Sequence, residues 1–299
     1  MSINRLNQIT IEDNYSKHNV RKYLIDKEIP HISSKIMEAV KLLGAWSLLN
    51  YYPSKNERIK ELKKHNKPFD LVIEIALIVL QESEYLTIQS VVGQLAPVLN
   101  MEDELQSIKT AAEIITVVCG SDLYDIIPAK CSVTGSILIE SNYQLKDSTL
   151  EYIKSKRYLP PLVCKPNEIT HNRSSGYLTK DESVILGKGN HHNKPLALDV
   201  LNISNSVALS LDEFILDYEE VSSKPLETAE KRSNFNKLVK RSNGIYQLLL
   251  DNDNKFYFSW RFDKRGRMYS KGYEVNIQST DYKKALINLH KKELITGDM

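Results

Sequence analysis

Apolar residues recur at helical spacing through most of the first 120 positions of the chain. From Ile36 to Leu49 they lie three and four positions apart, which predicts an amphipathic helix. Ser33 or Ser34 can cap the start of this helix, since a serine side chain accepts a hydrogen bond from the first free backbone N–H groups. Pro53 is expected to end it.

Two more apolar stretches in this part of the chain also predict helices. The run from Leu71 to Leu80 opens after Pro68 and is apolar enough to be buried on all sides. The stripe from Leu105 to Val118 follows Asn100 and Asp103, whose spacing resembles a capping arrangement, and stops at Gly120, a residue type that commonly terminates helices. Residues 1–157 are therefore predicted to form a helical N-terminal domain.

Beyond residue 120 the pattern changes to short alternating segments, turns and loops. A β-hairpin is expected near residues 126–145, with Val133-Thr134-Gly135-Ser136 at its turn. Its role is open between an ordinary surface hairpin and a wedge that enters DNA. Paired prolines at 160 and 161 predict an extended connector over residues 158–205.

Helices are predicted again from residue 206 to residue 255. The longest should run from about Leu226 to Leu250, where cations alternate with apolar positions so that one side packs and the other presents charge. These cations are Lys231, Arg232, Lys237, Lys240 and Arg241. The expected fold class is mainly α with minor β (α+β), closed by a strand-and-turn segment over residues 256–299.

Charge is distributed unevenly, although the formal net charge of the 299 residues is only +2. From Lys224 to Lys271 there are twelve Lys or Arg residues against five Asp or Glu, a net charge of +7, so the rest of the chain carries −5. A basic segment beside an acidic remainder is typical of a protein with one face on a polyanion. The alternative is a basic helix face that is simply exposed to solvent, which would give the same net charge without a polyanion partner.

Several classes of protein are disfavoured by what the sequence lacks. Three cysteines without a CxxC pair are typical of a reducing compartment, and His191-His192 has no thiol nearby to complete a zinc site. No apolar run approaches the roughly 20 residues of a membrane span, and the N-terminus does not resemble a signal peptide, so no membrane partner is expected. Gly187-Lys188-Gly189 does not have the spacing of a nucleotide phosphate loop.

The most distinctive segment is Asp263-Lys264-Arg265-Gly266-Arg267-Met268-Tyr269. Cations and aromatic residues gather around a single glycine, a composition suited to lying against a phosphate backbone. A basic β-turn with a packed tyrosine is the alternative interpretation.

This segment resembles the DxxGR signature of the single-subunit RNA polymerases of phages and mitochondria, sometimes called T-seven-type. The likeness extends over about residues 158–299 in the family's order, while residues 1–157 show no such correspondence. The matching stretches are Pro160-Pro161-Leu162-Val163, Pro195-Leu196-Ala197-Leu198, Asn202-Ile203-Ser204-Asn205-Ser206, Asn276-Ile277-Gln278, Asp281 and a Lys-rich amphipathic helix over Lys283–Leu289.

The resemblance implies that residues 206–255 are thumb-like helices and residues 256–299 the start of a right-hand palm. Arg265 and Arg267 would contact phosphates of the template or of the RNA–DNA hybrid, Gly266 would allow close approach or a positive φ, and Asp263 would orient an arginine or cap the turn. The implied nucleic-acid-binding set is Asp263, Lys264, Arg265, Gly266, Arg267, Tyr269, Lys237, Lys240 and Arg241.

The same resemblance implies that the catalytic metals lie elsewhere. Members of the family use two palm aspartates to hold two Mg²⁺ ions, and the aspartates that follow Arg267, Asp281 and Asp298, match neither. No catalytic residue and no metal ligand is therefore expected on this chain. Mg²⁺ would be bound by a second subunit that carries the fingers and most of the palm.

A natural split of this kind resembles the heterodimeric polymerases of N4-like bacteriophages. A polymerase truncated after the DxxGR segment would lack the same parts and is the alternative explanation. The chain is then expected to be the N-terminal subunit of a DNA-directed RNA polymerase, inactive alone, working in the cytoplasm of an infected bacterial host. Its partners would be the second subunit, DNA template, RNA transcript, NTP substrates and a single-stranded-DNA-binding recruitment protein. The alternative is a non-enzymatic, nucleic-acid-binding transcription regulator derived from a polymerase lobe. In either case, apolar surface is expected near Leu286 and Leu289.

Overall fold

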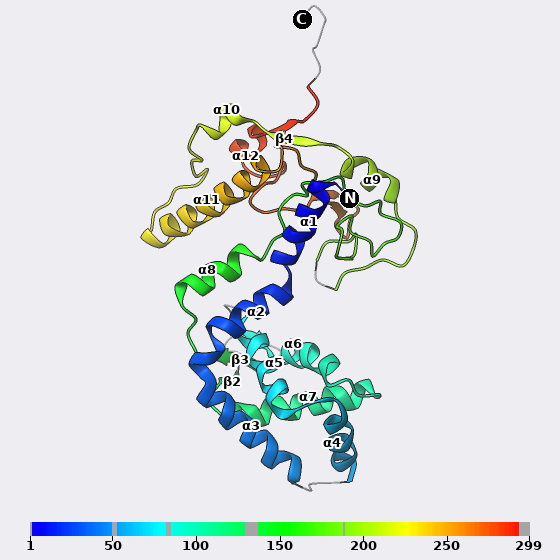
Figure 1. Ribbon diagram of the computed structural model, residues 1–299, viewed down its shortest axis with the longest axis vertical. Coiled ribbons are helices and arrows are strands. Elements are labelled where there is room, and N and C mark those ends of the chain that lie inside the picture. The colour runs from blue at the N-terminus through cyan, green and yellow to red at the C-terminus, as the bar shows by residue number, and fades with distance from the viewer. Residues whose placement is uncertain (1, 50–52, 82–84, 129–136, 188, 293–299) are drawn as a thin grey trace, which may run out of the picture. The chain divides into compact units, whose positions relative to one another are not determined.

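The computed structural model describes residues 2–49, 53–81, 85–128, 137–187 and 189–292 (Figure 1). It is mainly helical with a few short strands, as the sequence predicts. The chain divides into two compact units. One unit, here called the helical unit, is Lys17–Lys154, and the other, the composite unit, joins Met1–Ser16 to Ser155–Met299.

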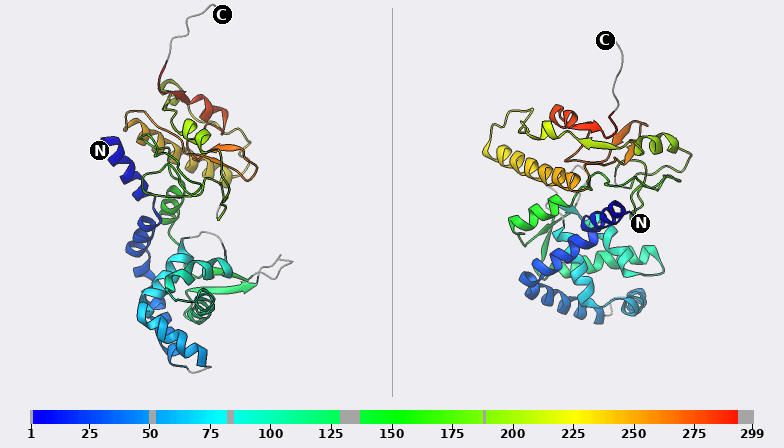
Figure 2. Two further views of the ribbon diagram at one scale, coloured as in Figure 1. Left: turned by 90° about the vertical axis from the view of Figure 1, so that its right-hand side faces the viewer. Right: turned by 45° about the horizontal axis from the view of Figure 1, so that its top comes forward.

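The helical unit consists of short helices and one small sheet, as the lower part of Figure 1 and the two views of Figure 2 show. Its helices are α2 (Lys17–Lys27), α3 (Ser33–Leu48), α4 (Pro53–His65), α5 (Pro68–Leu80), α6 (Ile88–Leu95), α7 (Glu104–Cys119) and α8 (Asp147–Ser155), with 3-10 turns at Ile29–Ile32 and Ala96–Leu99. The antiparallel sheet has the order β1-β3-β2, from β1 (Leu86–Thr87), β2 (Tyr124–Pro128) and β3 (Ile137–Ser141).

Helix α5 forms the centre of this unit, because most of its residues from Leu71 to Leu80 are buried and it packs against α2, α3 and α6. Strands β2 and β3 pair with Ile126 opposite Ile139. The expected hairpin turn, Val133-Thr134-Gly135-Ser136, lies outside the described residues.

Helix boundaries follow the sequence at one helix and depart from it at another. Of the predicted capping pair, Asp103 caps α7, since its Oδ1 accepts from the N–H groups of Leu105 (2.7 Å) and Gln106 (3.1 Å). Asn100 does not cap this helix, because it ends the preceding 3-10 turn in a left-handed conformation. The prediction of a serine cap on α3 is wrong. Ser33 is already helical, and the cap position is Ile32, which ends a preceding 3-10 turn and has no capping side chain.

The composite unit contains more irregular backbone than the helical unit. Its helices are α1 (Ile3–Asn14), α9 (Leu198–Asn205), α10 (Glu213–Leu216), α11 (Ala229–Leu250) and α12 (Asp281–Ala285), and its strands are β4 (Leu209–Leu211), β5 (Trp260–Phe262), β6 (Met268–Ser270) and β7 (Ile287–Leu289). Strand β4 pairs with β7, and β5 with β6, both antiparallel.

Helix α1 belongs to the composite unit, so the structure divides the chain differently from the expected 1–157 domain. Ile11 enters the apolar core formed by α11 and the strands around it. Gln8 Oε1 accepts from the Val163 N–H at 2.9 Å, and Glu12 accepts from the N–H groups of Leu178 (2.9 Å) and Thr179 (2.7 Å). These bonds tie the first residues to a segment more than 150 positions away.

Residues 158–205 are not uniformly extended, because they end in helix α9. Much of the preceding irregular segment is packed rather than exposed, with Leu162, Val163 and Val184 each at most 1% exposed. Leu162 forms an antiparallel bridge with Tyr257, and Ile185 a parallel bridge with Phe262. The segment is therefore part of the fold that supports β5.

The end of the described chain corrects two predictions. The expected amphipathic helix over Lys283–Leu289 stops at Ala285, because the next residues form β7 and pair with β4. Leu286 is 1% exposed and contributes to the core, whereas Leu289 is 61% exposed. Only the second of the two expected apolar surface residues is therefore at the surface.

Candidate nucleic-acid interface

The DxxGR segment forms the tip of the β5–β6 hairpin. Asp263 N–H donates to the Arg267 carbonyl at 2.8 Å, and Gly266 N–H donates to the Asp263 carbonyl at 3.0 Å. Gly266 has φ +82°, the left-handed conformation that a three-residue hairpin loop with a bulge requires. A Cβ at Gly266 would meet no atom within 4 Å, so backbone conformation and not internal packing favours glycine here.

Asp263 organises this turn through its carboxylate. Its Oδ1 accepts from the N–H groups of Arg265 (2.8 Å) and Arg267 (3.0 Å), and its Oδ2 accepts from Arg267 Nε (2.7 Å). These bonds, led by the one from the Arg267 backbone, hold the pKa of Asp263 below its usual value. The hydrogen bond with Asp263 in turn raises the pKa of Arg267. Asp263 thus caps the turn and orients one of its arginines.

The cations of the turn stay accessible. The Arg267 side chain is 56% exposed despite its ion pair with Asp263, and its guanidinium lies 5.6 Å from the centre of the Tyr269 ring. Lys264 and Arg265 are exposed, and neither side chain makes a hydrogen bond or ion pair with another described residue. Tyr269 is half-buried. The hairpin tip therefore presents positive charge to solvent.

The Asn-Gln pair of the resemblance braces β6. The Gln278 side chain accepts from the Ser270 N–H at 2.9 Å and donates to the Met268 carbonyl at 3.0 Å, so its amide pairs with the strand as a neighbouring backbone would. Asn276 Oδ1 accepts from Ser270 Oγ at 3.0 Å, and its Nδ2 donates to the Gly272 carbonyl at 2.9 Å.

Strand β5 is held on its other side by one of the matching stretches, residues 202–206, and by Val184 outside them. Asn205 Oδ1 accepts from the Trp260 N–H at 2.7 Å, and the Phe262 N–H donates to the Val184 carbonyl at 2.9 Å. Asn202 exchanges hydrogen bonds of 2.8 and 3.0 Å with the backbone of Ile169. Stretches separated by up to about 100 positions thus converge on one hairpin.

The predicted cations of α11 do not share one environment. Lys237 and Lys240 are exposed, whereas Arg241 is half-buried and its charge acts on Glu274. Beside them, burial lowers the pKa of Lys283, whose Nζ lies 4.0 Å from Glu220 Oε1. Arg241 therefore belongs more to a buried charged cluster than to the exposed face expected from the sequence.

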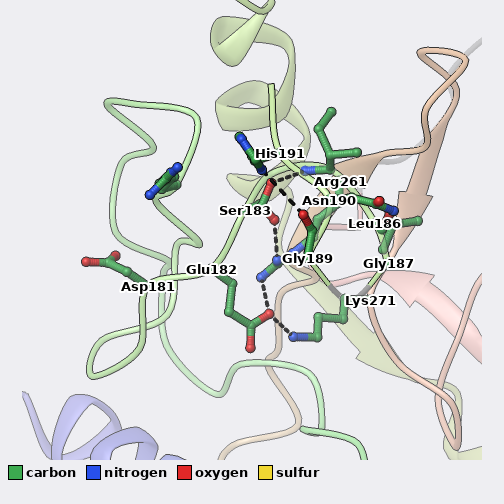
Figure 3. Close-up of a pocket in the computed structure, with 12 residues that line it drawn as sticks. Asp181, Glu182, Ser183, Leu186, Gly187, Gly189, Asn190, His191, Arg261 and Lys271 are labelled. Carbon is green, nitrogen blue, oxygen red and sulfur yellow. Dashed lines mark hydrogen bonds and ion pairs between the residues drawn. The ribbon is translucent and has the colours of Figure 1, made fainter. Parts of the chain in front are cut away.

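A second charged cluster was not anticipated from the sequence (Figure 3). Arg261 of β5 is 4% exposed, its NH1 donates to the Ser183 carbonyl at 2.5 Å, and its NH2 lies 2.9 Å from Glu182 Oε2. Lys271 Nζ contacts the same carboxylate oxygen at 2.5 Å. A charged residue inside the apolar stretch Phe256–Phe262 was the one sequence signal for this cluster.

Among the described residues, no group of three or more His, Cys, Asp or Glu is arranged to hold a metal ion. In the same residues, no helix combines the length and the apolar character needed to cross a membrane. The chain matches no model of a known protein family, and no curated protein is significantly similar to it.

Proposed function

We propose that this chain is the N-terminal subunit of a two-subunit DNA-directed RNA polymerase. In this role it holds template DNA and the RNA–DNA hybrid, while a second subunit carries the catalytic aspartates and Mg²⁺. The observation that carries the proposal is the DxxGR turn. It presents Arg265 and Arg267 on a hairpin that is braced by Asn205, Asn276 and Gln278, residues from the stretches that resemble the polymerase family.

The chemistry of the turn suits contact with phosphates and not with bases. Exposed guanidinium groups bind phosphate oxygens whatever the sequence, so such contacts position a strand without reading it. Asp263 holds Arg267 in one orientation before any strand arrives. This pre-alignment reduces the side-chain entropy lost on binding. Lys237 and Lys240 on α11 supply further charge for a backbone, as a thumb helix would.

Catalysis in this proposal belongs to the assembled complex. The partner's Mg²⁺ ions stabilise the attacking and leaving oxygens of phosphoryl transfer, and NTPs bind at the shared site. A recruitment protein that binds single-stranded DNA delivers the open template.

The test is co-expression with the product of the neighbouring gene, followed by co-purification and an RNA synthesis assay. We expect a stable complex that makes RNA only with Mg²⁺, and no nucleotide incorporation by this chain alone. Arg267→Ala should abolish most synthesis without preventing assembly, whereas Lys41→Ala, an exposed cation of the helical unit, should not change it.

Three outcomes contradict the proposal. Nucleotide incorporation by the lone chain would place the catalytic centre here. Full synthesis by Arg267→Ala would remove the role of the turn. A stable monomer that binds nucleic acid and recruits no second subunit would favour the transcription regulator instead.

A further inference from the structure

A cavity of about 690 Å³ lies beside β5, at the cluster of Arg261, Glu182 and Lys271 (Figure 3). Arg173 and His191 also line it, and both are exposed. Its volume is in the range of small-molecule sites, which is about 300–1,000 Å³.

The cluster in this cavity contains more positive than negative charge. The Glu182 carboxylate forms ion pairs with Lys180, Arg261 and Lys271, so three cations share one anion. Arg261 Nε is buried and makes no hydrogen bond within the described part of the chain. A buried guanidinium therefore keeps an unsatisfied donor beside a surplus of positive charge, which is unfavourable unless an anion is bound.

The titration of the cluster agrees with this imbalance. Burial, and next the like charge of Arg261, lower the pKa of Lys271 to about 8, although Glu182 opposes the shift. Lys180 lowers it further, and the Tyr177 ring centre lies 5.2 Å from the Lys271 amine. Glu182 is already ionised at neutral pH, because its cationic partners outweigh its burial and lower its pKa to about 2. Glu182 therefore cannot balance the surplus of positive charge by losing another proton.

We propose that the cavity binds a phosphate monoester. The cavity lining also carries Arg173 and Asp181, so with Lys180 there are four cations against two carboxylates, an excess of two positive charges. Above its second pKa, near 6, a phosphate monoester carries about two negative charges, which match this excess. Lys271, with 24% of its side chain exposed, is the donor that a ligand reaches, and Arg261 provides charge from the cavity floor. A phosphodiester or a carboxylate carries one charge and leaves half of the excess unbalanced.

Gly187 and Gly189 line the cavity, but their spacing is not that of a nucleotide phosphate loop, and the proposed site does not need one. Its cations come instead from separate segments, on Arg173, Arg261 and Lys271. The proposal also does not rest on the polymerase role, because the turn residues Arg265 and Arg267 are not among those that line the cavity.

The test is isothermal titration of the full chain with inorganic phosphate, a nucleoside 5′-monophosphate, and a single-stranded oligonucleotide with either a 5′-phosphate or a 5′-hydroxyl. We expect the monophosphate and the 5′-phosphorylated strand to bind more tightly than the 5′-hydroxyl strand. The stronger of the two identifies the source of the phosphate. Lys271→Met should weaken binding at least tenfold, and Lys284→Met, an exposed lysine elsewhere in the composite unit, should leave it unchanged.

The number of protons taken up on binding shows whether Lys271 contacts the ligand or only supports the fold. A bound dianion raises the pKa of Lys271, so binding at pH 8 should take up about half a proton per ligand, and affinity should fall as the pH rises above 8. Titrations in buffers of different ionisation enthalpy measure this uptake. If Lys271→Met does not fold, as judged by Trp260 fluorescence, Arg173→Met tests the same cavity from its exposed rim.

The proposal is overturned if neither the monophosphate nor the 5′-phosphorylated strand binds at millimolar concentration. It is also overturned if Lys271→Met folds and binds the monophosphate as tightly as the unchanged chain does, or if binding takes up no proton at pH 8.

Discussion

Glu12→Ala should destabilise the composite unit far more than an ordinary change on a helix surface. The Glu12 carboxylate is buried and accepts from the N–H groups of Leu178 and Thr179, from Thr179 Oγ1 at 2.6 Å and from Gln8 Nε2 at 2.9 Å. Alanine leaves both N–H groups without this acceptor.

The size of the loss follows from the number of bonds broken. Hydrogen bonds to a charged partner contribute about 1.5–3 kcal/mol each, and they are not additive, so losing the two backbone bonds should cost about 3–5 kcal/mol. Domains are stable by only about 5–15 kcal/mol in total. With a urea m-value of about 2 kcal/mol/M, the unfolding midpoint should fall by about 2 M.

The two tryptophans allow each unit to be followed separately, since Trp46 lies in the helical unit and Trp260 in the composite unit. In a Trp46→Phe background, urea unfolding monitored by fluorescence reports Trp260 alone. Asp13→Ala is the matched control, because it removes an exposed carboxylate from the same helix and should change stability by less than about 0.5 kcal/mol. Equal midpoints for Glu12→Ala and Asp13→Ala would mean that α1 is not part of the cooperative fold of this unit.

Three further predictions follow from the same structure. Lys237→Ala with Lys240→Ala should lower the slope of log binding constant against log salt concentration by about one unit per lost phosphate contact. Lys41→Ala should leave this slope unchanged. Filter binding between about 50 and 200 mM salt measures the slope. The pKa of Glu182 is about 2 in the fold against 4.5 unfolded, so its ionisation contributes about 3 kcal/mol of stability above pH 4.5, and this contribution is lost as the pH falls toward 2. Glu182→Gln should therefore reduce the difference in unfolding free energy between pH 6 and pH 3, measured by urea titration. An unchanged difference would refute the assignment. Gly266→Ala should lower RNA synthesis by the complex, since alanine is strained at φ +82° while the space around it is open, and normal synthesis would show that the turn tolerates another conformation.

Local signals in the sequence identified the features that depend on local physics. Asp103 caps α7, because a capping carboxylate acts within a few positions. Gly120 follows the last residue of this helix as expected, although its φ of −63° is not the left-handed conformation of a terminating glycine. The turn at Asp263–Arg267 is equally local, and its glycine takes the expected positive φ. The helix expected over Lys283–Leu289 failed for the opposite reason. Its last residues pair with β4, nearly 80 positions earlier, and this pairing overrides their local preference.

The support of the hairpin could not be predicted from residue patterns alone. Gln278 and Asn276 are polar residues in a loop, and nothing in their spacing indicates that their amides replace a missing backbone neighbour of β6. Asn205 acts in the same way on Trp260, across 55 positions. The resemblance to polymerases singled out these three residues without giving the reason for their presence.

These contacts show what the matching polar residues do in this fold. The asparagines and the glutamine each use their amides to hold the hairpin, through hydrogen bonds to the backbone of β5, β6 or the loop that follows. What they hold in place is a turn whose cations are exposed and whose one carboxylate already faces Arg267. The scaffold is therefore consistent with a role for the turn in binding phosphates. Variants of Asn276 or Gln278 should loosen β6 and so weaken phosphate binding by the turn, even though neither side chain would itself contact the nucleic acid.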